Sequence, residues 1–188
     1  MAGQSFRLHK PKNPWTHGLK TIGLALTLGF GVRIAAAHCY FIPSGSMKPT
    51  IQVNDRLFIE SISYRLINPR RGDIVVFTPP EEVIGKENFR AAYVKRVIGQ
   101  PGEKVEIKSG QVYINDRPLV ENYIADRPEY RWGPEIVPLD SYLVLGDNRN
   151  HSYDSHVWGF VKRDRIIGRA IIRFWPLDRA GSLSEKSE

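Results

Sequence analysis

The chain has 188 residues, of which 41% are hydrophobic, enough to build one domain with its own core. Its single cysteine, Cys39, excludes an internal disulfide. A net charge of +7 would suit a nucleic-acid-binding protein, but residues 1–20 hold four basic residues and no acidic one. The rest carries 23 basic side chains (27 minus 4) against 20 acidic ones, without a zinc-finger spacing or a basic helix. We therefore expect no nucleic-acid partner.

Residues 1–20 are predicted to be a basic cytoplasmic leader, and residues 21–39 an apolar segment with no charge before Arg33. Counted on to Ile42, this stretch is long enough to cross a bilayer core of about 30 Å at about 1.5 Å per residue. The basic residues before it place the N-terminus in the cytoplasm. The same features, with Ala35-Ala36-Ala37, also fit a cleavable signal peptide. The pattern alone does not separate a membrane anchor from a signal peptide.

The next stretch, Ile42-Pro-Ser-Gly-Ser-Met-Lys-Pro-Thr50, predicts a stiff and exposed bend. Its two prolines restrict the backbone, and Gly45 permits a sharp turn between two serines. Of the two hydroxyls, those of Ser44 and Ser46, one can act as a nucleophile and the other can donate a hydrogen bond to a developing oxyanion. An isolated Ser-Gly-Ser is more often a plain turn, so its interpretation depends on the motifs elsewhere in the chain.

Beyond this bend the pattern is that of short strands separated by Gly and Pro turns, with almost no helical periodicity, and it predicts an all-β domain. The strands are expected at 55–62, 73–77, 92–98, 105–107, 111–114, 141–146 and 168–175. Residues 121–140 are polar and contain several prolines, which predicts a short lobe or an ordered loop. The polar residues 179–188 are predicted to be a disordered tail.

Lys95 lies inside the predicted strand 92–98, where alternation puts it on the same face as Tyr93 and Val97. A lysine on an isolated strand is more often solvated than catalytic. If this face is buried, however, desolvation favours the neutral amine, which can act as a general base for a serine. His151 and His156, which flank Asp154, offer an alternative base in a Ser46–His–Asp triad.

Four motifs carry a resemblance to a known family, and they read as follows: Pro-Ser-Gly-Ser-Met-Lys-Pro-Thr (43–50), Arg-Gly-Asp-Ile-Val-Val-Phe (71–77), Tyr-Val-Lys-Arg-Val-Ile-Gly-Gln-Pro-Gly (93–102) and Gly-Asp-Asn-Arg-Asn-His-Ser-Tyr-Asp-Ser (146–155). In this order they resemble the type I signal peptidases, or leader peptidases, particularly the cyanobacterial and thylakoidal members. The resemblance covers the chain from about Thr21 to Pro176.

The resemblance implies an all-β catalytic domain of strongly bent antiparallel sheets at residues 40–178, preceded by one transmembrane helix at 21–39 that is kept as an anchor. It implies a membrane-anchored serine endopeptidase that cleaves signal peptides from exported pre-proteins after Ala-x-Ala sites. The expected partners are these signal peptides and the lipid bilayer, and no metal or organic cofactor is expected. The domain would act outside the plasma membrane or on the lumenal side of a thylakoid.

The resemblance also implies a role for each motif residue. Ser46 would be the nucleophile and Lys95 its general base, while Ser44 and the Ser46 backbone N–H would form the oxyanion hole. Ser152 would hydrogen-bond and orient Lys95, with Asp154 and Asp147 as support. The sequence departs from many bacterial members at His156, where they have arginine, and at Gln100 and Glu103.

In this family the chain around the serine and the lysine strand forms shallow apolar pockets for small side chains of the substrate. The matching residues are Ile42, Pro43, Met47, Ile51, Tyr93 and Val94, with Leu57 and Val76 as less certain members. Two other functions fit parts of the pattern. One is a self-cleaving repressor with the same pair of residues, against which the apolar segment argues. The other is an inactive exported β-domain that binds a partner.

Overall fold

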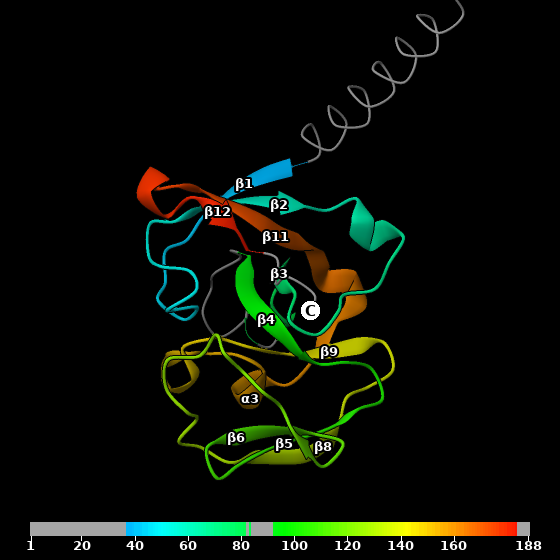
Figure 1. The fold of residues 1–188 in the computed structure, drawn as a ribbon. Coiled ribbons are helices and arrows are strands. Elements are labelled where there is room, and N and C mark those ends of the chain that lie inside the picture. The colour runs from blue at the N-terminus through cyan, green and yellow to red at the C-terminus, as the bar shows by residue number, and fades with distance from the viewer. Residues whose placement is uncertain (1–36, 82, 84–91, 184–188) are drawn as a thin grey trace, which may run out of the picture. The chain divides into compact units, whose positions relative to one another are not determined.

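The structure is a computed structural model that describes residues 37–81, 83 and 92–183. Two antiparallel sheets make up this part of the chain (Figure 1). The larger sheet has the strand order β1-β2-β11-β3-β4-β9-β10, and β12 pairs with β11. Its strands are β1 Ala37–Phe41, β2 Arg56–Glu60, β3 Ile74–Phe77, β4 Tyr93–Gly99, β9 Ser141–Leu145, β10 Val161–Lys162, β11 Ile166–Trp175 and β12 Gly181–Ser182.

The smaller sheet has the order β7-β6-β5-β8. Its strands are β5 Lys104–Lys108, β6 Gln111–Ile114, β7 Arg117–Pro118 and β8 Trp132–Ile136. Besides the helical residues Glu81 and Val83, the helical elements among the described residues are single turns: η1 Ser63–Arg65, η2 Arg149–His151, α3 Ser155–Trp158, η3 Arg163–Arg165 and η4 Leu177–Arg179. The predicted β domain of antiparallel strands is confirmed for this part of the chain.

Strand β3 explains how the lysine strand becomes buried. Ile74 and Val76 pack into one apolar cluster, while Val75 and Phe77 pack into a second cluster on the other face. A strand covered on both faces reads as a continuous apolar run, as this one does. Because β4 is paired between β3 and β9, its Lys95 is carried into the same interior.

The larger sheet is strongly curved, as Figure 1 shows where the strands turn from β11 through β4 toward β9. Register shifts mark the bends: two in the pairing of β11 with β2, one between β11 and β3, and one between β4 and β9. Bulges of this kind bend a strand and increase its twist. At Gly168 a Cβ atom would lie only 2.6 Å from the carbonyl oxygen of Glu60, so glycine is needed where β11 crosses β2.

The strands predicted at 105–107 and 111–114 are confirmed as β5 and β6, which form a hairpin with Ser109 and Gly110 both at positive φ in its turn. Five strands lie outside the predicted ranges: β1, β7, β8, β10 and β12. Strand β8 lies in the polar segment 121–140 and pairs with β5. Strand β1 consists of residues that the sequence pattern joins to the apolar segment, and it pairs with β2.

The predicted boundaries at both ends of the domain need correction or lie outside the described residues. The anchor predicted at 21–39 lies outside them apart from 37–39, which form the start of β1. Within the described residues no helix is long and apolar enough to cross a membrane. The tail predicted to be disordered from residue 179 starts too early, because Gly181 and Ser182 pair with β11 and the Leu183 N–H donates to the Ile171 carbonyl.

Candidate active site

The bend that carries the two serines is held from below by apolar side chains. Ile42, Met47 and Ile51 are buried in the first apolar cluster, together with side chains of β2, β3 and β11. Backbone hydrogen bonds close the bend, from the Ile51 N–H to the Met47 carbonyl and between Ile42 and residues 54 and 55. The exposed Ser44 and the half-buried Ser46 therefore stand on a fixed base rather than on a mobile loop.

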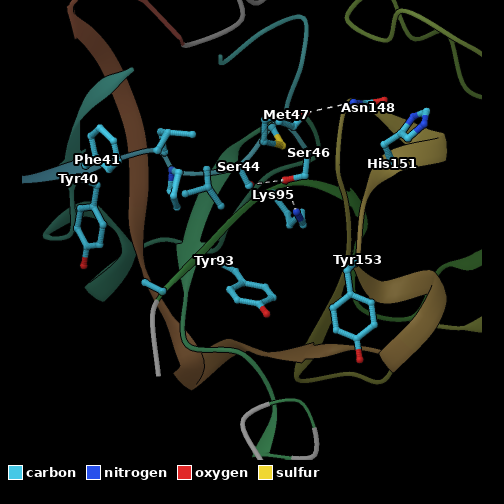
Figure 2. Close-up of a pocket in the computed structure, with 15 residues that line it drawn as sticks. Tyr40, Phe41, Ser44, Ser46, Met47, Tyr93, Lys95, Asn148, His151 and Tyr153 are labelled. Carbon is cyan, nitrogen blue, oxygen red and sulfur yellow. Dashed lines mark hydrogen bonds between the residues drawn. The ribbon is translucent and has the colours of Figure 1, made fainter. Parts of the chain in front are cut away.

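Lys95 reaches this bend from strand β4. Its side chain is 4% exposed, and its Nζ lies 2.6 Å from the Ser46 Oγ. Burial lowers the pKa of Lys95 to about 8, although Asp154 and Asp147 act in the opposite direction. The Ser46 Oγ is also 3.3 Å from the Ser44 Oγ. A serine hydroxyl thus lies against an amine that can be neutral near physiological pH, with a second hydroxyl beside it (Figure 2).

The loop after strand β9 completes the site, and it depends on Gly146. A Cβ atom at this position would lie 2.4 Å from the Ser46 carbonyl oxygen and 2.2 Å from the Ser152 Oγ. Only glycine allows the two chain segments to approach so closely. The Gly146 N–H donates to Asp154 Oδ2 at 2.8 Å, which ties the loop to the start of α3.

Asp147 and Asp154 are both fully buried and have different partners. Asp147 forms two hydrogen bonds with Arg96, of 2.8 and 2.7 Å, and accepts a third from the Thr50 hydroxyl at 2.6 Å. It therefore joins the end of β9 to β4 and to the serine bend. Asp154 Oδ1 lies 2.8 Å from His156 Nδ1, and the imidazole stacks on the Tyr130 ring at a centroid distance of 4.1 Å.

Two predicted contacts differ in the structure. The Ser152 Oγ is buried near Gly146, but it has no hydrogen-bond partner among the described residues, so the expected bond to Lys95 is not formed. The Asp154–His156 pair lacks the contact with Ser46 that a histidine triad would need, because the side-chain partners of Ser46 are Lys95 and Ser44. The geometry therefore favours the lysine as the base.

A cleft of about 510 Å³ opens over the two serines. Of the six residues predicted as pocket walls, five line it: Ile42, Pro43, Met47, Tyr93 and Val94. The sixth, Ile51, is fully buried in the first apolar cluster, as are the less certain candidates Leu57 and Val76. Ile51 shows that a position close to the nucleophile in sequence does not determine which way a side chain points.

The cleft is also lined by residues that were not predicted as pocket walls: Tyr40, Phe41, Ala92, Asn148, Tyr153 and His151, which the sequence suggested only as an alternative base. Figure 2 shows Tyr40 and Phe41 on one side of the two serines and the loop residues Asn148, His151 and Tyr153 on the other. The signal for the last three was available, since they lie within the motif at 146–155. Tyr40 and Phe41 directly precede the serine bend.

A profile of the family described as signal peptidase, peptidase S26, matches residues 15–175. The chain belongs to this family. A signal peptidase I of Leptolyngbya laminosa is 55% identical over 93% of this chain and 86% of its own length. The probable thylakoidal processing peptidase 2 of Arabidopsis thaliana is 34% identical over 94% of this chain and 48% of its own length. The crystal structure of a signal peptidase I from Enterococcus faecalis is 32% identical, with a TM-score of 0.47, over 55% of this chain and 97% of that one.

Proposed function

We infer that this signal peptidase is a serine endopeptidase that cleaves signal peptides from pre-proteins with a Ser46–Lys95 dyad. The peptidase activity follows from the family and from the similarity to signal peptidase I. The assignment of the dyad rests on one observation above all, the 2.6 Å distance between Lys95 Nζ and Ser46 Oγ in the floor of the cleft. A buried lysine with its pKa lowered to about 8 has the proton affinity that a general base needs.

In the proposed reaction Lys95 takes the proton of the Ser46 hydroxyl as Oγ attacks the carbonyl carbon of the scissile bond. The tetrahedral intermediate collapses when Lys95 returns this proton to the leaving amine, and the signal peptide stays on Ser46 as an ester. Lys95 then takes a proton from a water molecule as the water oxygen attacks the ester carbonyl. It returns this proton to the Ser46 Oγ when the intermediate collapses, and the signal peptide leaves with a free carboxyl group. Each step uses the same proton carrier, so no second titrating residue is required.

The oxyanion of the intermediate would be bound by the Ser44 hydroxyl and the Ser46 backbone N–H. Ser44 is exposed, and its Oγ lies 3.3 Å from the nucleophilic Oγ. Because the hydroxyl can rotate, it can turn from Ser46 to the oxyanion as charge develops. Asp154 would act on Lys95 through its charge, and Asp147 would hold the loop through its bonds to Thr50 and Arg96.

The cleft walls suit a substrate in an extended conformation. Residues 40–47 form one wall and residues 92–95 form another, so a peptide laid between them would alternate its side chains against apolar surfaces. Met47 is 1% exposed and Ile42 4% exposed, so these side chains are closely packed beneath the cleft, and a small substrate side chain such as alanine would be placed against them more easily than a large one. Cleavage after Ala-x-Ala sites is the specificity that such walls support.

The enzyme would be anchored in a plasma or thylakoid membrane, with the N-terminus in the cytoplasm or stroma and the catalytic domain on the far side. The basic residues 1–20 followed by the apolar residues 21–36 support this topology. Substrates carry an apolar signal peptide in the same membrane, so anchoring would raise the effective concentration of one for the other. Protection of a C-terminal reporter from protease added on the cytoplasmic side is the expected outcome.

Cleavage of an Ala-x-Ala precursor by variants of the full chain tests the dyad. We expect Ser46→Ala and Lys95→Ala to abolish cleavage, and Ser44→Ala to lower kcat by about a hundred- to a thousandfold. Lys104→Ala is the matched control, because this lysine is exposed on the smaller sheet and does not line the cleft. An active Ser46→Ala enzyme, or an active Lys95→Ala enzyme beside an inactive histidine variant, would contradict the dyad.

A further inference from the structure

Asn148 connects the loop after strand β9 to the serine bend by two hydrogen bonds. Its backbone N–H donates to the Ser46 carbonyl oxygen at 3.0 Å. Its side-chain Nδ2 donates to the Gly45 carbonyl oxygen at 3.1 Å, as the dashed line in Figure 2 shows. A carbonyl oxygen can only accept, so the chemistry itself requires the amide nitrogen on this side. Asn148 therefore binds the carbonyls of both Gly45 and Ser46, and the Gly45 carbonyl also accepts from the Lys48 N–H at 3.1 Å.

This arrangement controls the direction of the Ser46 N–H. The Gly45 carbonyl and the Ser46 N–H belong to one planar peptide group, and in a trans peptide they point in opposite directions. A hydrogen bond that fixes the Gly45 oxygen on one side therefore fixes the Ser46 N–H on the other. The bond to the Ser46 carbonyl holds the next peptide group in the same way, so the backbone is restrained on both sides of the nucleophile.

We propose that Asn148 is a positioning residue that aims the Ser46 N–H at the oxyanion. This inference rests on the proposed function, in which that N–H is an oxyanion donor. A donor gains most when it is oriented before the charge develops, since no reorganisation is then needed during the reaction. The hydrogen bond to Gly45 also polarises the shared peptide group, which strengthens the N–H as a donor. Asn148 acts on the oxyanion side of the reaction, because the contact between Ser46 and Lys95 does not include it.

The test compares two variants of the full chain, Asn148→Asp and Asn148→Ala, in cleavage of an Ala-x-Ala precursor. Both keep the backbone bond to Ser46 and lose the side-chain donor to Gly45. We expect kcat to fall by about ten- to a hundredfold, less than for the loss of a donor itself, with little change in KM. Asn148→Asp keeps the shape of the side chain but puts an anionic acceptor against a carbonyl, so it should fall further than Asn148→Ala.

Two readouts separate positioning from a structural role. In Asn148→Ala the acid limb of the pH–rate profile should not move, because no charge near Lys95 changes. A peptide aldehyde that forms a tetrahedral adduct with Ser46 should bind more weakly by the same factor by which kcat falls, whereas the affinity for a cleaved product peptide should not change. Asn150→Ala is the matched control. It removes two hydrogen bonds to residues 127 and 129 from the same loop and none to the serine bend, so kcat should be unchanged.

The inference is overturned if the Asn148 variants keep the wild-type kcat and aldehyde affinity, or if only their thermal stability falls. It is also overturned if kcat falls while aldehyde affinity is retained. Circular dichroism identifies an unfolded Asn148→Ala, and Asn148→Asp, which is nearly isosteric, then decides. Ser46→Ala in the same assay keeps the two hypotheses apart. If Ser46→Ala is inactive and the Asn148 variants are normal, only this inference fails, whereas an active Ser46→Ala enzyme removes the proposed function itself.

Discussion

Strand β4 carries one buried basic residue on each face, Lys95 and Arg96, and the two have different surroundings. On the cleft side Lys95 is 4% exposed, its Nζ contacts the Ser46 hydroxyl, and it forms no ion pair within the part of the chain that the structure describes. On the other side the next residue, Arg96, is 2% exposed and forms two hydrogen bonds with the fully buried Asp147. Two adjacent positions thus hold a base that can lose its proton and a cation fixed in a bidentate pair.

The difference between Lys95 and Arg96 has a physical cause. A buried charge without a partner is costly, and lysine can avoid the cost by losing its proton, whereas arginine cannot. The Arg96–Asp147 pair therefore serves to hold β4, β9 and the serine bend together, and Lys95 is left as the group that titrates. Catalysis requires that Lys95 has no carboxylate partner of the kind that Arg96 has, because such a partner would keep the amine protonated.

The largest expected effect is on stability at the paired side. Arg96→Met should lower the free energy of unfolding by about 3–5 kcal/mol, because it leaves the carboxylate of Asp147 buried without its cation. The double variant Arg96→Met/Asp147→Leu should recover a large part of this loss, since both charges are then absent. Urea unfolding at neutral pH measures both. If Arg96→Met costs no more than the exposed Lys104→Met, the pair does not have this role.

Replacing Lys95, the cation without a carboxylate partner, should raise the free energy of unfolding instead of lowering it. The pKa of Lys95 is lowered from 10.5 to about 8 in the folded state, so the unfolded state binds more protons between these values and stability rises with pH across this window. Below about pH 8 the wild type carries the full penalty, about 3 kcal/mol at about 1.36 kcal/mol per pKa unit. Lys95→Met removes the titrating group, so its gain over the wild type should be constant below pH 8 and decline toward pH 10.5.

Unfolding of the wild type and of Lys95→Met from pH 6 to 11 checks this difference. Lys104→Met, on the smaller sheet, is the control for the loss of a lysine outside the cleft. If the difference in stability between Lys95→Met and the wild type does not change between about pH 8 and 10.5, the pKa of Lys95 is not lowered, which contradicts its use as a base.

Much of this contrast can be predicted from the sequence. The β-branched run at 73–77 and the alternation at 92–98 indicate strands and separate the face of Lys95 from that of Arg96. The motifs identify the serine bend and the loop at 146–155. What the pattern cannot supply is the partner of each charged residue, because Arg96 and Asp147 are 51 residues apart and meet only through the pairing of β4 with β9.

The errors have physical causes of the same kind. The sequence pattern joins strand β1 to the apolar segment, because an apolar stretch looks alike whether lipid or a neighbouring strand covers it. Strand β8 contains Gly133 and Pro134, which weaken a strand pattern, and it is found through its pairing with β5. The motif assigns Ile51 to the pocket, but its side chain points into the apolar cluster beneath the bend.

The smallest expected effect is that of His156 on the pKa of Lys95. His156 does not contact Lys95 and acts on it through Asp154. Asp154 raises the pKa of Lys95, against the lowering effect of burial. The Asp154 carboxylate lies 2.8 Å from the imidazole of His156, which Tyr130 stacks upon. A permanent cation in place of the imidazole would offset part of the field of Asp154 at Lys95, and a neutral amide would not.

We therefore expect His156→Arg to move the acid limb of the pH–rate profile to lower pH. His156→Gln should leave the limb unmoved or shift it to higher pH. Each shift should be less than about one pH unit, because the charge acts on Lys95 through the intervening Asp154. His38→Gln, on the exposed part of β1, is the control for the loss of a histidine. The decisive result is which variant has its acid limb at the lower pH. Altered packing against Tyr130 would lower the activity of both variants but would not shift their acid limbs according to the charge at position 156. If the acid limb of His156→Gln lies at the same pH as that of His156→Arg or at lower pH, the charge at position 156 does not set the pKa of Lys95.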